Sequence, residues 1–146
     1  MESLKLPKER LCTALLRLEE SIEDLENFKK RKSAHTTDYT DYERQERTFR
    51  DSLIKRFEFC VDLFWKYLKK YLEIAGGNPP EIYSPKPVIK AACKAKLITE
   101  QDTEVLLEMI DSRNQTSHIY KEEIADQIGA KAPIFYKIMH QYAQKL

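Results

Sequence analysis

Two neighbouring apolar stripes along residues 42–74 constrain the fold more than any other feature of the sequence. The first stripe is formed by Phe49, Leu53, Phe57, Cys60, Phe64, Leu68 and Tyr71. The second is formed by Ile54, Val61, Trp65 and Leu72. Both follow helical spacing, and together they make one helix apolar over a wide surface. We therefore expect a long central helix that packs against several others.

A second amphipathic helix is predicted over residues 8–31. Its apolar positions alternate by four and three residues: Leu11, Leu15, Leu18, Ile22 and Leu25. Pro7 stands just before it, where a first-turn proline is tolerated. The polar segment 33–40 is expected to be a loop, and Thr40 or Asp41 is expected to cap the central helix.

The rest of the chain also favours helices. Residues 76–80, with the sequence Gly-Gly-Asn-Pro-Pro, should end the central helix. A short helix is expected from Pro85 to near Lys96, and a fourth from a Thr99 cap to Arg113. The last helical region, 121–146, should be broken or kinked at Gly129 and Pro133. No strand alternation is present, so we predict an all-α single domain over residues 1–146, a bundle of about five helices.

Composition excludes several classes of protein. The 25 basic and 24 acidic residues nearly cancel, so overall charge gives no strong attraction to nucleic acid. Cys12, Cys60 and Cys93 are far apart and match no zinc or disulfide pattern, so we expect neither a metal nor another cofactor. The sequence has no apolar run typical of a signal peptide or a membrane span. A cytoplasmic location is the simplest expectation.

The candidate functional segment is residues 113–120. If the fourth helix continues, Arg113, Asn114, His118 and Tyr120 fall in the sector that is apolar one and two turns earlier, which predicts an inward or interfacial position. Arg113 and His118 are five residues apart and do not face each other squarely on one helix. Either the helix ends between them, or two copies of the chain meet across a two-fold axis.

Two interpretations of Arg113 are open at this point. In the first, Arg113 pairs with a carboxylate of the central helix, Glu58 or Asp62, and His118 is a packing residue. In the second, the planar guanidinium binds phosphate and His118 exchanges protons near pH 7. The second arrangement would support metal-independent cleavage of RNA.

The motif at 113–120, Arg-Asn-x-x-x-His-x-Tyr, resembles the Arg-x4-His-x-Tyr signature of the HEPN superfamily. The central helix, with Arg-Phe-Glu at 56–58 and Trp-Lys at 65–66, resembles one branch of it. The segment 84–92, with Ser-Pro-Lys and Val-Ile-Lys-Ala-Ala, resembles the short helix of that branch. This branch is the nucleotidyltransferase substrate-binding family, which includes the HEPN toxins of HEPN–MNT toxin–antitoxin pairs.

The resemblance implies a HEPN-like bundle with a four-helix up-and-down core that forms a homodimer. It implies a metal-independent endoribonuclease with Arg113 and His118 as catalytic residues and Asn114 in support. It also implies a partner nucleotidyltransferase of the MNT type, an antitoxin that attaches AMP to Tyr120, so that Arg113 and Tyr120 bind the nucleotide. The alternative is a non-catalytic subunit that binds a nucleotide or substrate for that enzyme. A third interpretation is a structural dimerisation module.

Overall fold

The computed structural model describes residues 2–32, 39–75 and 83–146. These residues form five α-helices and one short 3-10 helix. The elements are α1 (Glu2–Lys32), α2 (Tyr39–Ala75), α3 (Pro85–Lys94), α4 (Glu100–Asn114), η1 (Thr116–His118) and α5 (Glu122–Lys145). No strand occurs in these ranges, which confirms the predicted all-α class.

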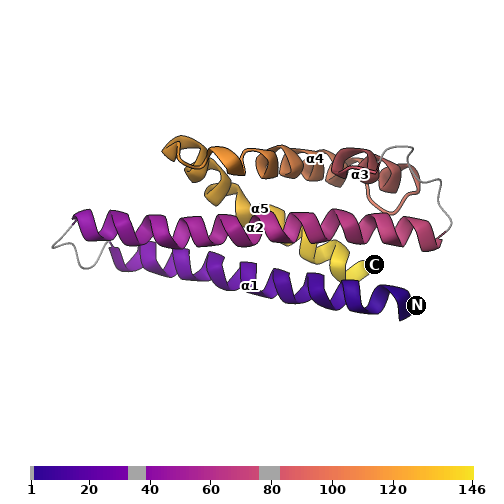
Figure 1. The fold of residues 1–146 in the computed structure, drawn as a ribbon, viewed down its shortest axis with the longest axis horizontal. Helices are drawn as coiled ribbons and strands as arrows, with labels where there is room; N and C mark the ends of the chain where they lie inside the picture. The colour runs from indigo at the N-terminus through magenta and orange to yellow at the C-terminus, as the bar shows by residue number, and fades with distance from the viewer. Residues whose placement is uncertain (1, 33–38, 76–82) are drawn as a thin grey trace.

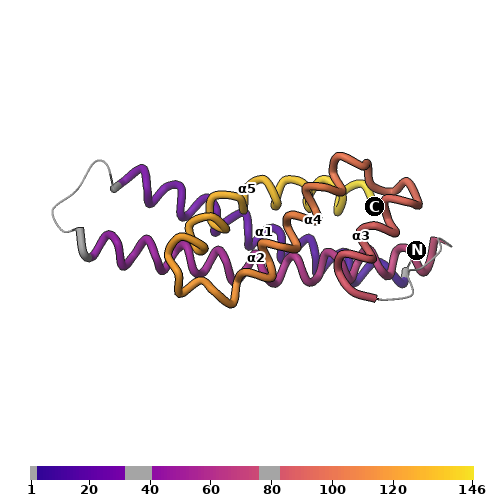
Figure 2. The backbone as a smooth tube through the Cα atoms, turned by 90° about the horizontal axis from the view of Figure 1, so that it is seen from above, coloured from indigo at the N-terminus to yellow at the C-terminus, as the bar shows by residue number. Residues whose placement is uncertain are grey.

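The helices form an up-and-down bundle around α2. Helices α1 and α2 are antiparallel along most of their length, and α3 and α4 return along the other side of α2 (Figure 1). Helix α5 then runs antiparallel to α4 and packs against α1, α2 and α4. The view from above shows that the last turns of α1 and the first turns of α2 extend beyond the other helices (Figure 2).

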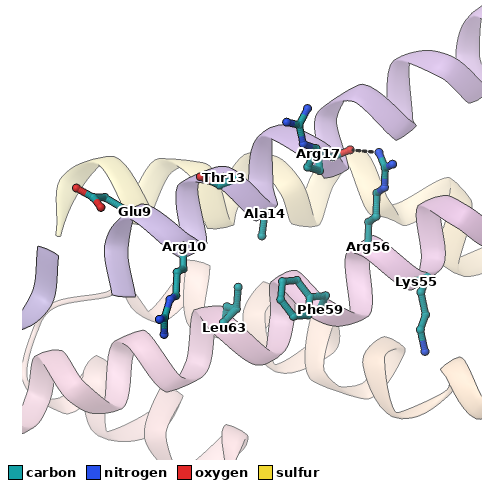
Figure 3. Close-up of a pocket in the computed structure, with 9 residues that line it drawn as sticks. All are labelled: Glu9, Arg10, Thr13, Ala14, Arg17, Lys55, Arg56, Phe59 and Leu63. Carbon is teal, nitrogen blue, oxygen red and sulfur yellow. Dashed lines mark hydrogen bonds between the residues drawn. The ribbon is translucent and has the colours of Figure 1, made fainter. Parts of the chain in front are cut away.

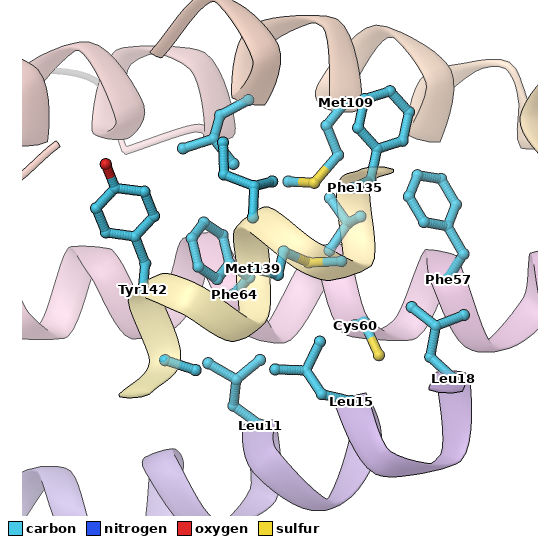
Figure 4. Packing of buried hydrophobic residues seen from close by; sticks show 14 of the residues in the cluster. Leu11, Leu15, Leu18, Phe57, Cys60, Phe64, Met109, Phe135, Met139 and Tyr142 are labelled. Atoms are coloured by element: carbon cyan, nitrogen blue, oxygen red, sulfur yellow. The ribbon is translucent and has the colours of Figure 1, made fainter. Parts of the chain in front are cut away.

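The core is built where α5 enters the space between the other helices. Figure 4 shows Phe135, Met139 and Tyr142 of α5 among apolar side chains of α1, α2 and α4. The predicted stripe of α1 is buried at every position, as are most positions of the two stripes of α2. Full burial of a side chain such as Phe135 stabilises the fold by roughly 1.5–3 kcal/mol. The two stripes therefore explain why α2 contacts each of the other α-helices.

The start of α1 differs from the prediction. The helix begins at Glu2 rather than near Lys8, so Pro7 lies inside it. Leu4 is buried in the core, and its burial favours the extra turn before the proline. Helix α2 likewise begins at Tyr39, so Thr40 and Asp41 belong to its first turn rather than to a cap.

The predicted break in the last helix is wrong. Helix α5 continues without interruption through Gly129 and Pro133. An interior proline costs roughly 3 kcal/mol, because it removes one backbone hydrogen bond and crowds the preceding turn. Apolar side chains on both sides of Pro133 are buried, among them Ile128 and Phe135. Their combined burial exceeds that cost, so tertiary packing keeps the helix intact.

The predicted cap of α4 is confirmed. The Thr99 hydroxyl accepts a hydrogen bond from the backbone N–H of Asp102 at 3.1 Å. The Asp102 carboxylate accepts a hydrogen bond from the phenol of Tyr142, on the last turns of α5. The start of α4 is thus fixed to the end of α5. None of the helices in the described ranges combines the length and apolarity needed to cross a membrane.

Candidate functional site

The segment between α4 and α5 carries the candidate motif. Helix α4 ends at Asn114, and residues 116–118 form the 3-10 helix η1. The backbone N–H of His118 donates to the carbonyl of Gln115 at 2.9 Å, and that of Lys121 donates to the carbonyl of His118 at 3.0 Å. The helix therefore ends between Arg113 and His118, which was one of the two expected solutions.

Arg113 is held by carboxylates of α2. Its Nε and Nη2 atoms donate to the two carboxylate oxygens of Asp62, each at 3.0 Å. Its Nη2 also lies 3.5 Å from Oε1 of Glu58. The hydrogen bonding to Asp62 raises the pKa of Arg113 above its ordinary value. Pairing with both candidate carboxylates is confirmed, so the first of the two interpretations describes the arginine in this structure.

Thr116 completes the surroundings of the guanidinium. Arg113 Nη1 donates to the Thr116 hydroxyl at 3.1 Å, and that hydroxyl donates to the Arg113 carbonyl at 2.9 Å. Thr116 is buried. The arginine side chain therefore fastens the first turn of η1 to the last turn of α4. The hydrogen bond to Thr116 accounts for one of the two N–H groups of Nη1, so the second could reach a ligand.

The other motif residues are exposed. Asn114 and His118 face solvent, and Tyr120 is 73% exposed. The rings of His118 and Tyr120 meet edge to face with centroids 6.1 Å apart. The helical wheel placed these side chains inward or at an interface. An inward position is wrong for the single chain. His118 and Tyr120 lie beyond the end of α4, and Asn114 is exposed although it belongs to the last turn of that helix.

A second arginine, Arg50 of α2, makes a larger ion-pair cluster. Its side chain is only 7% exposed, and its Nη1 lies 2.6 Å from Glu122 and 3.0 Å from Asp126. Its Nη2 lies 3.1 Å from Asp51. Burial alone would lower the pKa of Arg50, but the hydrogen bonds to Glu122 and Asp126 raise it on balance. The same bonding lowers the pKa of Glu122.

The Arg50 cluster fixes the first turns of α5, directly after the motif. Arg113 and Arg50 therefore connect the two ends of the 115–121 segment to the same helix, α2. No role for Arg50 was predicted from the sequence. The sequence does contain a signal for an ion pair here. Arg50 is a charged residue on the apolar stripe of Leu53 and Phe57, and the acidic residues at 122 and 126 share one face of the last helix.

Packing explains the surroundings of His140, Trp65 and Cys60. His140 is exposed and stacks on Tyr136, with ring centroids 5.6 Å apart. Trp65 is half-buried and packs on the core, as expected, and the Cys60 thiol is buried. His35 lies outside the described residues. Within the described ranges no three His, Cys, Asp or Glu side chains are grouped so that they could hold a metal ion.

Comparisons with known proteins match most of the chain to one family. Residues 9–146 match the model of the family described as nucleotidyltransferase substrate binding protein like. A solved structure from Thermus thermophilus is 29% identical, with a TM-score of 0.64, over 88% of this chain and 97% of that one. The comparison with curated proteins gave no significant match.

Two further solved structures share the fold at lower identity. The first is a Haemophilus influenzae protein described as having the fold of a substrate binding domain of a nucleotidyltransferase. It is 21% identical with a TM-score of 0.75, over 94% of this chain and 97% of that one. The second is a tri-AMPylated Shewanella oneidensis HEPN toxin in complex with its MNT antitoxin. It is 16% identical with a TM-score of 0.62, over 92% and 93% of the two chains.

Proposed function

Because the chain belongs to the nucleotidyltransferase substrate binding protein like family, within the HEPN superfamily, we propose that it is a toxin subunit that cleaves RNA without a metal ion. The observation that carries the proposal is the exposed His118 on the short segment that Arg113 holds against α2. Asn114 is exposed at the end of α4, one residue from Arg113, and can contact the same ligand.

The chemistry requires a base, an acid and a stabilising charge. The ribose 2′-hydroxyl attacks the adjacent phosphorus, the bond to the 5′-oxygen of the next nucleotide breaks, and a cyclic phosphate forms. His118 takes the proton of the 2′-hydroxyl or gives a proton to the leaving oxygen. Arg113 stabilises the negative charge that develops on the phosphoryl oxygens.

A second copy of the chain completes the site in this proposal. One imidazole cannot act as base and acid in the same step, whereas two motifs across a two-fold axis would provide both. A homodimer that joins the 113–120 segments would also cover the exposed Tyr120 and His118 rings in part. The expected partner surface is therefore the face that carries these two side chains.

A nucleotidyltransferase partner would control the site through Tyr120. The exposed phenol can attack the α-phosphorus of ATP, so that an O–P bond forms, pyrophosphate leaves and the phenol proton passes to solvent. The AMP phosphate would stand close to His118, whose ring contacts Tyr120. A negative charge at this place would repel RNA and hold the toxin inactive.

The test measures RNA cleavage by the purified protein in the presence of a metal chelator. We expect His118→Ala to reduce the cleavage rate by about 100-fold or more, because general acid–base catalysis contributes a factor on the order of 100 to 10,000. His140→Ala is the matched control, since it also removes an exposed imidazole and should leave the rate unchanged. Equal cleavage by the wild type and His118→Ala would contradict the proposal.

A second candidate function is a non-catalytic subunit that binds a nucleotide for the partner enzyme. One specific observation favours it. The Nε and Nη2 atoms of Arg113, which together would best bind a phosphate, both donate to Asp62. In this function the remaining N–H of Nη1 and the Tyr120 ring would contact the nucleotide.

Calorimetry with ATP and AMP, on the wild type and on Arg113→Ala, separates the two functions. Binding that depends on Arg113 in a protein that cleaves no RNA would support the second function. Cleavage that depends on His118 would exclude a purely binding role.

A further inference from the structure

A groove between α1 and α2 is separate from the motif. It has a volume of about 640 Å³. Its floor is apolar and consists of Ala14 from α1 with Phe59 and Leu63 from α2. Figure 3 shows Phe59 and Leu63 of α2 and Ala14 of α1 directed into the space between the two helices.

Phe59 is the unusual residue of this groove. It is 60% exposed, whereas its neighbours along α2, Phe57 and Phe64, are almost completely buried. The residues of α1 that face it, Thr13 and Ala14, are small, so the hollow above the ring stays open. A large exposed aromatic side chain in an apolar hollow is a common feature of protein–protein interfaces.

The rim of the groove is basic. Arg10, Arg17, Lys55 and Arg56 line it, and Glu9 is the acidic residue among its lining residues. Arg56 donates to two neutral acceptors, the Arg17 carbonyl at 2.9 Å and the Ser21 hydroxyl at 2.8 Å. In the ranges that the structure describes, neither Arg10 nor Arg56 makes an ion pair. Arg17 and Lys55 are already paired, with Glu20 at 2.9 Å and Glu58 at 3.9 Å, so the positive charge that remains for a partner belongs to Arg10 and Arg56.

We propose that this groove binds an amphipathic helix of another protein, one that presents an apolar side chain flanked by Asp and Glu. The apolar side chain would fill the hollow over Phe59, and the carboxylates would pair with Arg10 and Arg56. An apolar centre with a charged rim is the usual organisation of such interfaces.

The charge distribution argues against two other occupants. A second copy placed on this face by a two-fold axis would bring the same basic rim against itself, which is unfavourable. RNA would find cations at the rim and could stack one base on Phe59, but the lining contains no second aromatic ring on which a neighbouring base could stack. The inference does not depend on RNA cleavage, since no groove residue belongs to the motif.

Fluorescence anisotropy with a labelled helical peptide tests the proposal. The peptide has a central phenylalanine with glutamates three and four residues to each side, so that they share one helix face. We expect saturable binding to the full chain. Phe59→Ser and Arg10→Glu should each weaken it by at least tenfold, about 1.4 kcal/mol.

Leu16→Ser is the matched control, because Leu16 is 50% exposed on α1 but lies on the helix face opposite Ala14. It should bind the peptide as the wild type does. Circular dichroism and thermal melting verify that each variant is folded, and folding should persist because the replaced side chains are exposed.

Four results would overturn the proposal. The first is equal binding of the peptide by Phe59→Ser and the wild type, and the second is equal binding of a peptide with lysine in place of glutamate. The third is preferential binding of a single-stranded RNA that depends on Phe59. The fourth is loss of a dimer, measured by light scattering, when Phe59 alone is changed, since a second copy would then be the occupant.

Discussion

Arg50 on α2 and Arg113 on α4 each contact carboxylates of another helix, but their surroundings differ. Arg50 is 7% exposed and contacts three carboxylates, two of them on α5. Arg113 is 27% exposed and contacts Asp62, Glu58 and Thr116. The first guanidinium is enclosed by its partners, whereas the second is more accessible to solvent.

The difference indicates a division of roles around the motif. Arg50 is buried and its Nε, Nη1 and Nη2 atoms all contact carboxylates, so we expect it mainly to organise the protein. A half-exposed arginine with a competing carboxylate can exchange that carboxylate for a phosphate. Variants of Arg50 should therefore mainly lower the stability of the fold. Variants of Arg113 should mainly change RNA cleavage and ligand binding.

The largest expected effect is on catalysis. We expect Arg113→Ala to slow RNA cleavage by about 100-fold, because loss of one group that stabilises developing charge typically costs a factor on the order of 100 to 1,000. Single-turnover cleavage of a defined RNA measures it. Arg113→Lys should be slowed less, since it keeps the charge and loses the planar fork. Equal loss in a folded Arg50→Ala variant would remove the distinction between the two arginines.

The next effect is on stability. Arg50→Ala should lower the free energy of unfolding by about 2 kcal/mol, because it removes both a buried aliphatic stem and the ion pairs to α5. Arg113→Ala should lower it by about 1 kcal/mol, since its pair with Asp62 is partly solvated. Urea denaturation followed by circular dichroism compares the two variants. A greater loss for Arg113→Ala would reverse the assignment.

A smaller effect is expected when the carboxylate that competes for Arg113 is neutralised. Asp62→Asn should increase the affinity of the site for AMP by about fivefold, close to the roughly 1 kcal/mol that a partly exposed ion pair contributes. Calorimetry measures this change. Asp51→Asn, beside Arg50, is the matched control and should leave the affinity unchanged. A decrease with Asp62→Asn would mean that Asp62 positions Arg113 for binding rather than competing with the ligand.

The smallest effect concerns pH. The folded state lowers the pKa of Glu122 below its ordinary value of 4.5, because the carboxylate accepts a hydrogen bond from Arg50. The stabilisation is therefore complete above about pH 4.5 and is lost as the pH falls through the lower folded value. Unfolding free energies of the wild type and Glu122→Gln should differ at about pH 6 and converge in acid. A difference that grows on acidification would contradict the pairing.

Much of the fold could be predicted because the stripes on α1 and α2 follow the helical period closely. Leu11, Leu15 and Leu18 are buried as that period requires. The misplaced boundaries have a common cause. At Pro7 and Pro133, local propensity disfavours a helix, but the burial of Leu4 and Phe135 by other helices outweighs it. Long-range packing of this kind is not visible in a sequence window.

The site was predictable in part. The pairing of Arg113 with Asp62 or Glu58 was one of the two interpretations that the sequence left open, and the cost of an unpaired buried charge was its physical basis. The outward direction of His118 and Tyr120 was not predicted, because the helical wheel assumes a continuous helix, whereas α4 ends at Asn114. The Arg50 cluster joins residues of α2 and α5 that are far apart in sequence, so only the fold brings them together.

The attachment of residues 115–121 to α2 at both ends has an entropic consequence. A flexible segment that folds around its ligand loses conformational entropy at the moment of binding, and this loss weakens the affinity. Here Arg113 and Arg50 restrict the segment before any ligand arrives. The restriction is completed during folding of the bundle, so a ligand that binds at His118, as we propose, would find this side chain in a nearly preset position. Preorganisation of this kind favours fast chemistry over adaptable recognition.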